Sequence, residues 1–184
     1  FATLAERFAP RVMTTTVTPP DEHGNMSLSL HAGATVRELH RAAADPDRIV
    51  IVEANTQVPR TMGLPPEYPH VLHVDEVDVI VSSDRPPFAL EEPPATDVEQ
   101  AIAAHARTFI TDGCTLQTGI GGVPSMVVSL LAEQDGGDYG VHSEMFTTGL
   151  MRLHQAGKVS NAGKGVFDGV SVTTFALGTS DLYE

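Results

Sequence analysis

The feature that most constrains the fold is a strand that runs into a glycine loop and then into a helix, predicted over residues 115–124 (TLQTGIGGVP). Residues 139–142 predict the next strand, and Glu144 follows it. In a parallel sheet the carboxyl ends of successive strands lie side by side. The loop and Glu144 are therefore expected to share one crevice, at the edge where open α/β sheets bind ligands.

The loop carries three glycines within four positions, Gly119, Gly121 and Gly122. Such a backbone can approach a ligand closely, with N–H groups free to face an anion. The N-terminus of the following helix adds the positive end of its dipole. A phosphate or the oxyanion of an acyl-transfer intermediate would suit this arrangement, and a tight strand-to-helix turn with no ligand is the structural alternative.

The loop also has to be compared with the dinucleotide fingerprint G-x-G-x-x-G. Pro124 stands where that fingerprint has its third glycine, and Glu144 lies near the distance of its ribose-binding acid. A nicotinamide or flavin binder is therefore a rival on spacing, which Pro124 weakens. For Glu144 three interpretations remain open: a solvated loop residue, a ribose ligand, or a catalytic carboxylate acting as a nucleophile on an activated acyl group.

The first half of the chain predicts strands as well. The β-branched run at 49–52 is typical of a strand buried on both faces, and polar residues follow its end, which makes Asn55 and Gln57 candidate substrate contacts. A proline-dense segment, residues 84–95, is the predicted domain boundary. The order strand, loop, helix, strand, helix, strand after it predicts a parallel sheet and an α/β fold.

Two capping boxes predict where helices begin, Thr35 with Glu38 and Thr96 with Glu99. After the second box, apolar residues at helical spacing predict one buried face, and His105 on that face is interpreted as a core or interface histidine. The residues of this face are Val98, Ala101, Ile102, His105 and Phe109.

Composition excludes several classes of function. The 184 residues carry a net charge of −13, with 24 acidic and 11 basic residues, which argues against nucleic-acid binding by phosphate neutralisation. Cys114 is the single cysteine, so no internal disulfide forms and a reducing, cytoplasmic location is expected. No apolar run reaches the ~20 residues of a membrane helix, and the histidine spacing matches no metal motif, so no metal is expected.

Three segments together resemble the acetyl-CoA hydrolase/transferase family, whose relatives include acetate and 4-hydroxybutyrate CoA-transferases. They are LQTGIGGVP at 116–124, GVHSEMFTTG at 140–149 and FALGTSDLY at 175–183. Two earlier segments, at 18–24 and 53–61, are also similar to that family. The resemblance implies parts of two similar open α/β domains with mainly parallel sheets and the active site at their interface. Residues 1–90 would be the C-terminal part of the first domain and 91–184 the N-terminal part of the second.

The resemblance also implies a reaction. Glu144 matches the family's catalytic glutamate, and Gly119, Gly121, Gly122 and Pro124 match its loop next to the CoA thioester. CoA would move between a short-chain acyl-CoA and a carboxylic acid in a ping-pong reaction through a glutamyl-CoA thioester. Coenzyme A would enter as substrate, with no permanently bound cofactor, and a homo-oligomer is expected.

Some expectations stay alternatives. The family usually has Asn-Pro-Asn where residues 55–57 stand as Asn-Thr-Gln, so the contacts of Asn55 and Gln57 remain open. Lys164 and Arg60 are candidate cations for the phosphates of CoA. Water reaching the intermediate would make the protein an acetyl-CoA hydrolase. The other hypotheses are a dinucleotide-binding oxidoreductase and a non-catalytic protein, either a truncated chain or a scaffold that binds CoA without turnover.

Overall fold

The computed structural model describes residues 2–30 and 35–184. They form two compact units, one of residues 1–88 with 183–184 and one of residues 89–182. No helix or strand occurs at 84–96, which joins them. Their assignment to the first and second CoA-transferase domains stays a prediction.

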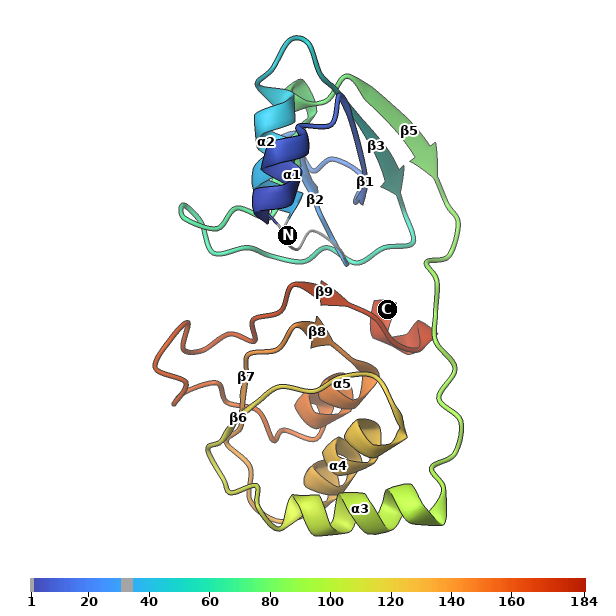
Figure 1. Cartoon of the computed structure of the whole chain (residues 1–184), viewed down its shortest axis with the longest axis vertical. Coiled ribbons are helices and arrows are strands. Elements are labelled where there is room, and N and C mark those ends of the chain that lie inside the picture. The colour runs from blue at the N-terminus through green and yellow to red at the C-terminus, as the bar shows by residue number, and fades with distance from the viewer. Residues whose placement is uncertain (1, 31–34) are drawn as a thin grey trace. The chain divides into compact units, whose positions relative to one another are not determined.

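The first unit is built on a parallel sheet of three strands in the order β1-β3-β5. In β3 every second residue, beginning at Val50, is buried, and these residues face α2. Helix α2 lies against this face of the sheet, and α1 packs on α2 (Figure 1). A short antiparallel pair, β2 with β4, completes the core. The elements are α1 (Ala2–Phe8), β1 (Val12–Val17), β2 (Asn25–Ser27), α2 (Val36–Ala43), β3 (Ile49–Asn55), β4 (Val71–His73), the 3₁₀ turn η2 (Val74–Glu76) and β5 (Val79–Ser83).

The opposite face of this sheet carries apolar side chains that stay exposed. On this face Val12 is 50% exposed, Ile49 43%, Val79 43% and Val81 51%. Parallel sheets are ordinarily covered on both faces. The sheet of the first unit is therefore one-sided within the described part of the chain.

The second unit packs three helices against short parallel strand pairs, β6 with β7 and β8 with β9. Helix α3 contacts α4, and α4 contacts α5. Its core is centred on the fully buried Tyr139, whose hydroxyl accepts a hydrogen bond from Gln134 at 2.7 Å. The elements are α3 (Asp97–Arg107), β6 (Thr115–Leu116), α4 (Gly122–Glu133), β7 (Gly140–Val141), β8 (Met145–Phe146), α5 (Thr148–Gln155), β9 (Phe175–Ala176) and η3 (Ser180–Tyr183), whose last residue is assigned to the first unit.

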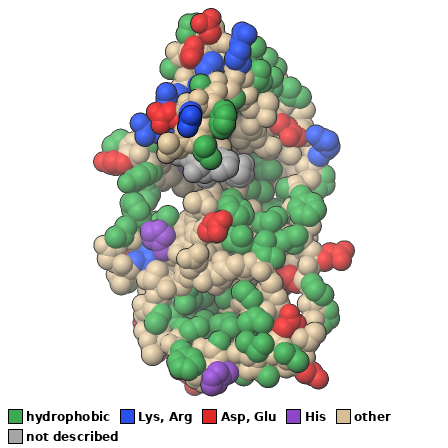
Figure 2. All heavy atoms as spheres, viewed as in Figure 1, with side chains coloured by type: hydrophobic (Ala, Val, Ile, Leu, Met, Phe, Trp, Pro, Cys, Tyr) green, Lys and Arg blue, Asp and Glu red, His purple; other side chains and the backbone are tan. Residues whose placement is uncertain are grey.

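The α/β class and the mainly parallel pairing are confirmed, while two local predictions are wrong. The capping box at Thr35 does not form, because the Thr35 side chain makes no capping hydrogen bond and Glu38 turns inward to Arg48. The predicted buried face of α3 is exposed instead: Val98 is 68% exposed and Phe109 75%. Hydrophobic side chains accordingly gather on the surface of the second unit over α3 and α4 (Figure 2).

The buried position of α3 is Ala103, and a small residue there lets α3 pack closely on α4. His105 lies on the exposed face with Phe109, their rings in an edge-to-face contact with centroids 5.5 Å apart. His105 is thus not a core residue. The capping box at Thr96 does form: its hydroxyl accepts from the Glu99 N–H, and the Glu99 carboxylate accepts from the Thr96 N–H at 2.8 Å.

Candidate active site

The glycine loop connects β6 to α4 in the second unit, as the sequence predicts. Gly121 is the N-cap of α4 and has φ 142° and ψ 163°, a backbone conformation that is essentially restricted to glycine. Its carbonyl accepts the first helical hydrogen bond, from Ser125. Pro124 lies in the first turn of α4, where no helical partner exists for the missing N–H. This sharp turn is what directs the loop away from the strand.

The three glycines of the loop differ in what would oppose a larger side chain at each position. Gly121 is required by its backbone conformation. At Gly122 a Cβ would meet the carboxylate of Glu99, the end of a side chain that would have to shift. Gly119 has neither constraint: its φ lies outside the left-handed region, and no described atom beyond its two chain neighbours lies within 4 Å of the position that a Cβ would take. The described residues therefore leave open space at Gly119.

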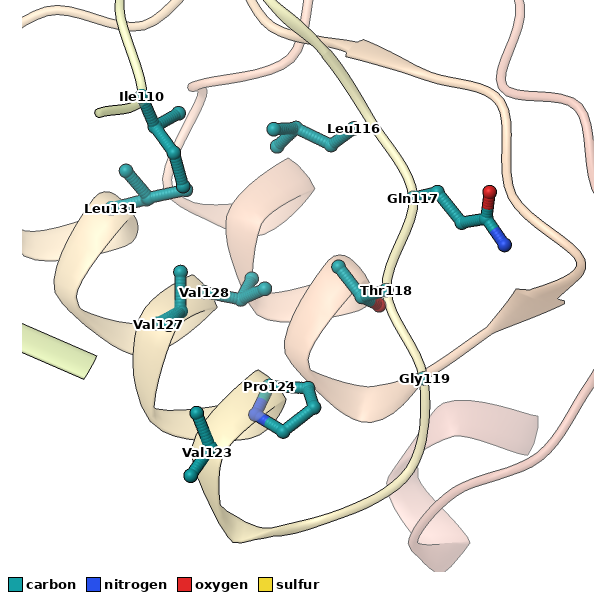
Figure 3. Close-up of a pocket in the computed structure, with 10 residues that line it drawn as sticks. All are labelled: Ile110, Leu116, Gln117, Thr118, Gly119, Val123, Pro124, Val127, Val128 and Leu131. Carbon is teal, nitrogen blue, oxygen red and sulfur yellow. The ribbon is translucent and has the colours of Figure 1, made fainter. Parts of the chain in front are cut away.

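A cavity of about 280 Å³ lies between the loop and α4. Figure 3 shows Val127, Val128 and Leu131 pointing from α4 toward Leu116, while the side chain of Gln117 points away from the cavity. The cavity is therefore lined mostly by apolar side chains, on the side of the loop that faces α4. Its lining residues are Ile110, Leu116, Gln117, Thr118, Gly119, Val123, Pro124, Val127, Val128 and Leu131.

The segment that carries Glu144 lies beside the glycine loop. Strands β6 and β7 pair in parallel with Leu116 opposite Val141, and the His142 N–H donates to the carbonyl of Leu116 at 3.1 Å. Beyond that point the buried Ser143 continues the connection. Its hydroxyl accepts from the N–H of Thr118 at 3.2 Å and donates to the Thr118 carbonyl at 3.1 Å. The residues next to this pair are Gly119 and Glu144.

Glu144 has a fixed backbone and an unengaged side chain. Its carbonyl accepts hydrogen bonds from the N–H of Thr174 at 2.9 Å and from the Thr174 hydroxyl at 2.5 Å. The residue lies in a bend between β7 and β8 and is exposed. Among residues 2–30 and 35–184, its carboxylate makes no hydrogen bond or ion pair. A carboxylate held this way is available to a ligand.

The other predicted contact residues belong to the first unit. The Asn55 side chain is buried and already engaged: its amide donates to the carbonyl of Arg85 at 2.9 Å, and its oxygen accepts from the N–H of Gln57 at 2.8 Å. Asn55 thus shapes the turn after β3. The Gln57 side chain is exposed. Because the two residues and the glycine loop lie in different units, a shared site remains a prediction.

The two candidate cations for phosphate are also engaged by the protein. Arg60 donates to the carbonyls of Pro19 and Asn25, each at 3.1 Å, and pairs with Asp21 at 3.4 Å. Lys164 donates to the carbonyls of Val141 and Val170. Burial lowers the pKa of Lys164 below its usual value, with Asp168 acting in the opposite direction. Both cations therefore tie loops to strands.

Sequence reasoning missed the roles of Ser143 and Thr174 and the packing of Glu99 beside Gly122. Ser143 stands directly before Glu144, so its position was visible, but a hydrogen bond across 25 residues carries no local signal. Thr174 and Glu99 act through contacts formed only in the folded chain. Among the described residues no cluster of histidine, cysteine, aspartate or glutamate could hold a metal ion, and no helix there is both long and apolar enough to cross a bilayer.

Comparison with known proteins gives the chain its relatives. It is 39% identical over 173 residues to succinyl-CoA:cyclohexane-1-carboxylate CoA transferase from Geobacter metallireducens, which covers 94% of this chain and 37% of that protein. It is 36% identical over 168 residues to 4-hydroxybutyrate coenzyme A transferase from Clostridium kluyveri, covering 91% of this chain and 36% of the relative. The chain thus spans little more than a third of the length of these relatives.

A solved structure is also similar to this chain. The crystal structure of RipA from Yersinia pestis superimposes with a TM-score of 0.90 and 32% identity, over 100% of this chain and 40% of that one. No protein-family model matches the sequence. Over nearly all of its length, the chain is thus similar in sequence to proteins named as CoA-transferases.

Proposed function

We propose that this chain carries the nucleophile of a CoA-transferase, and that the nucleophile is Glu144. The observation that supports this most directly is the state of Glu144: an exposed carboxylate on an anchored backbone, joined through Ser143 and Thr118 to a loop with open space at Gly119. A carboxylate is a competent nucleophile toward an acyl thioester when it is held in place. The similarity to CoA-transferases supports the reaction class of this proposal.

The reaction would proceed by two half-reactions. The Glu144 carboxylate attacks the acyl carbon of an acyl-CoA and expels CoA thiolate, which leaves a mixed anhydride. The thiolate then attacks the glutamyl carbonyl, forms a thioester between CoA and Glu144, and releases the first acid as its carboxylate. A second carboxylate attacks this thioester, and the expelled thiolate attacks the new acyl carbon. The products are a new acyl-CoA and the free Glu144 carboxylate.

The glycine loop would act on the oxyanion that forms at each attack. Backbone N–H groups that are fixed before the reaction stabilise such a charge without reorganising, and one donor is worth ~10²–10³ in rate. Gly119 supports this role because no residue of the described ranges, apart from its chain neighbours, occupies the space beside it. Gly121 and Gly122 would support it indirectly, since the conformation of one and the packing of the other set the course of the loop.

For the substrates, we propose a short-chain acyl-CoA and a carboxylic acid, with coenzyme A bound only as part of the substrate. The relatives are named for cyclohexane-1-carboxylate and for 4-hydroxybutyrate, acids that share a carboxylate on a small carbon skeleton. Hydrolysis of the same acyl-CoA is the competing outcome, because water that reaches the anhydride or the thioester replaces the second acid. A homo-oligomer and a cytoplasmic location belong to the same proposal.

The test is trapping of the intermediate in the complete protein. Incubation with acetyl-CoA alone, followed by proteolysis and mass spectrometry, should find CoA attached to Glu144, and borohydride should reduce the same residue. Glu144→Gln should fold as the parent does and carry no label. A screen of acid acceptors beside a reaction without acceptor separates transfer from hydrolysis. Label on another residue, or full transfer by Glu144→Gln, would show that the nucleophile is misassigned.

A further inference from the structure

The Ser143 hydroxyl takes over where the backbone pairing of β6 and β7 ends. Backbone bonds join the N–H of Gly140 to the carbonyl of Cys114 and the N–H of His142 to that of Leu116, each at 3.0–3.1 Å. The next N–H along the first segment, that of Thr118, bonds instead to the Ser143 hydroxyl, which in turn donates to the Thr118 carbonyl. One side chain thus replaces two backbone groups.

We infer that Ser143 is a positioning residue, which fixes the glycine loop relative to the nucleophile proposed above. This inference rests on the proposed role of Glu144. Gly119 and Glu144 are the covalent neighbours of the bonded pair, so the bond determines how far the loop N–H groups lie from the reacting carboxylate. Ser143 is itself 5% exposed, and it acts through Thr118 without touching the substrate.

The other contacts nearby leave the spacing between the glycine loop and Glu144 to the Ser143 hydroxyl. Its own N–H donates to the carbonyl of Val172 at 3.0 Å, which anchors its backbone from the other side. A second contact between the segments joins the hydroxyls of Thr118 and Thr147 at 3.4 Å, longer than either bond of Ser143. Without the Ser143 hydroxyl, the N–H and carbonyl of Thr118 lose their partner, and the loop is free to shift against Glu144.

Misplacement of reacting groups by about 1 Å costs on the order of 10²-fold in rate. In the complete protein, Ser143→Ala should therefore lower kcat by roughly 10- to 100-fold, while the KM for acyl-CoA stays within about threefold. Single-turnover formation of the CoA thioester on Glu144 should slow by the same factor as kcat. Ser143→Thr keeps the hydroxyl and should recover most of the rate, and Ser143→Cys, with its weaker hydrogen bonds, should fall between.

Ser129→Ala is the matched control, because the Ser129 hydroxyl also donates to a backbone carbonyl, that of Ser125 at 2.9 Å, but within α4. It should leave kcat unchanged. The inference is overturned if Ser143→Ala forms the thioester at the parent rate, or if Ser143→Thr is as slow as Ser143→Ala. If Ser143→Ala does not fold, the kcat of Ser143→Cys tests the inference instead, and a kcat equal to that of the parent overturns it. Glu144→Gln is measured in parallel: if it transfers CoA, the proposed function fails; if it is inactive while Ser143→Ala is fast, only the positioning role fails.

Discussion

Substitution of Gly119 by alanine separates a ligand-binding role of the loop from a structural one. The backbone of Gly119 lies outside the left-handed region, and within the part of the chain that the structure describes an added Cβ would meet no atom within 4 Å except those of its chain neighbours. The methyl group therefore costs the folded state nothing. It also restricts the unfolded chain, and glycine-to-alanine changes at compatible sites raise the free energy of unfolding by about 0.4–1 kcal/mol.

Activity should respond in the opposite direction. If the loop N–H groups approach the thioester oxygen, a methyl group at Gly119 projects into the space that the substrate occupies. Gly119→Ala keeps its N–H, but the methyl group would hold the oxyanion away from the loop. Loss of one oxyanion contact lowers kcat by ~10²–10³, so Gly119→Ala should reduce transfer by at least about 10²-fold. The expected result is thus a protein that is slightly more stable and nearly inactive.

The assay combines urea unfolding with CoA transfer in the complete protein. Gly163→Ala is the control, because Gly163 is also exposed, also has an ordinary backbone and also has no atom within 4 Å of its Cβ position. Gly163→Ala should raise the free energy of unfolding as much as Gly119→Ala does, and it should keep full transfer activity. Transfer by Gly119→Ala at the parent rate would refute the reasoning, since the open space would then serve no ligand.

Three further predictions concern the framework around the site. Gly121→Ala forces a side chain into a glycine-only conformation and should lower the free energy of unfolding by about 1–3 kcal/mol in urea titration; an unchanged midpoint would contradict it. Glu38→Gln removes the carboxylate that pairs with the buried Arg48 at 2.8 Å and should lower the free energy of unfolding by about 3–5 kcal/mol. A decrease below about 1 kcal/mol would mean that the pair is dispensable. Burial lowers the pKa of His154 below 6.5, so its stabilising contribution is present above pH 6.5 and is lost as pH falls from there through the folded pKa. Denaturation at pH 7.5 and 5.5 should show a smaller drop for His154→Phe than for the parent, and equal drops would exclude the effect.

The two capping boxes show where sequence reasoning holds and where it fails. At Thr96 the local pattern has no competitor, because both side chains stay at the surface, and the box forms as predicted. At Thr35 the same pattern is overridden. Glu38 is buried and pairs with Arg48, ten residues away, so a tertiary ion pair takes the carboxylate that the local rule assigns to the helix N-terminus.

The helix α3 gives a second lesson. Its apolar spacing correctly predicts a helix but not the direction of its buried face, because periodicity identifies a stripe and not the partner of that stripe. Close packing on α4 favours the alanine side, with Ala103 fully buried, and leaves Ile102 49% exposed. The candidate site follows the same rule: strand order brings Glu144 beside the loop, while the side-chain bond of Ser143 becomes visible only in three dimensions.

The one-sided sheet of the first unit has a practical consequence. Its uncovered face presents apolar side chains, among them Val12 and Val81, each about half exposed. Fluorescent dyes such as ANS bind exposed apolar surface and are commonly taken as reporters of loosened, partly unfolded states. The folded 184-residue chain should bind such a dye in its native state, with fluorescence that falls on full unfolding. Dye fluorescence would then measure this face, and loss of native packing has to be followed by another signal, such as near-ultraviolet circular dichroism.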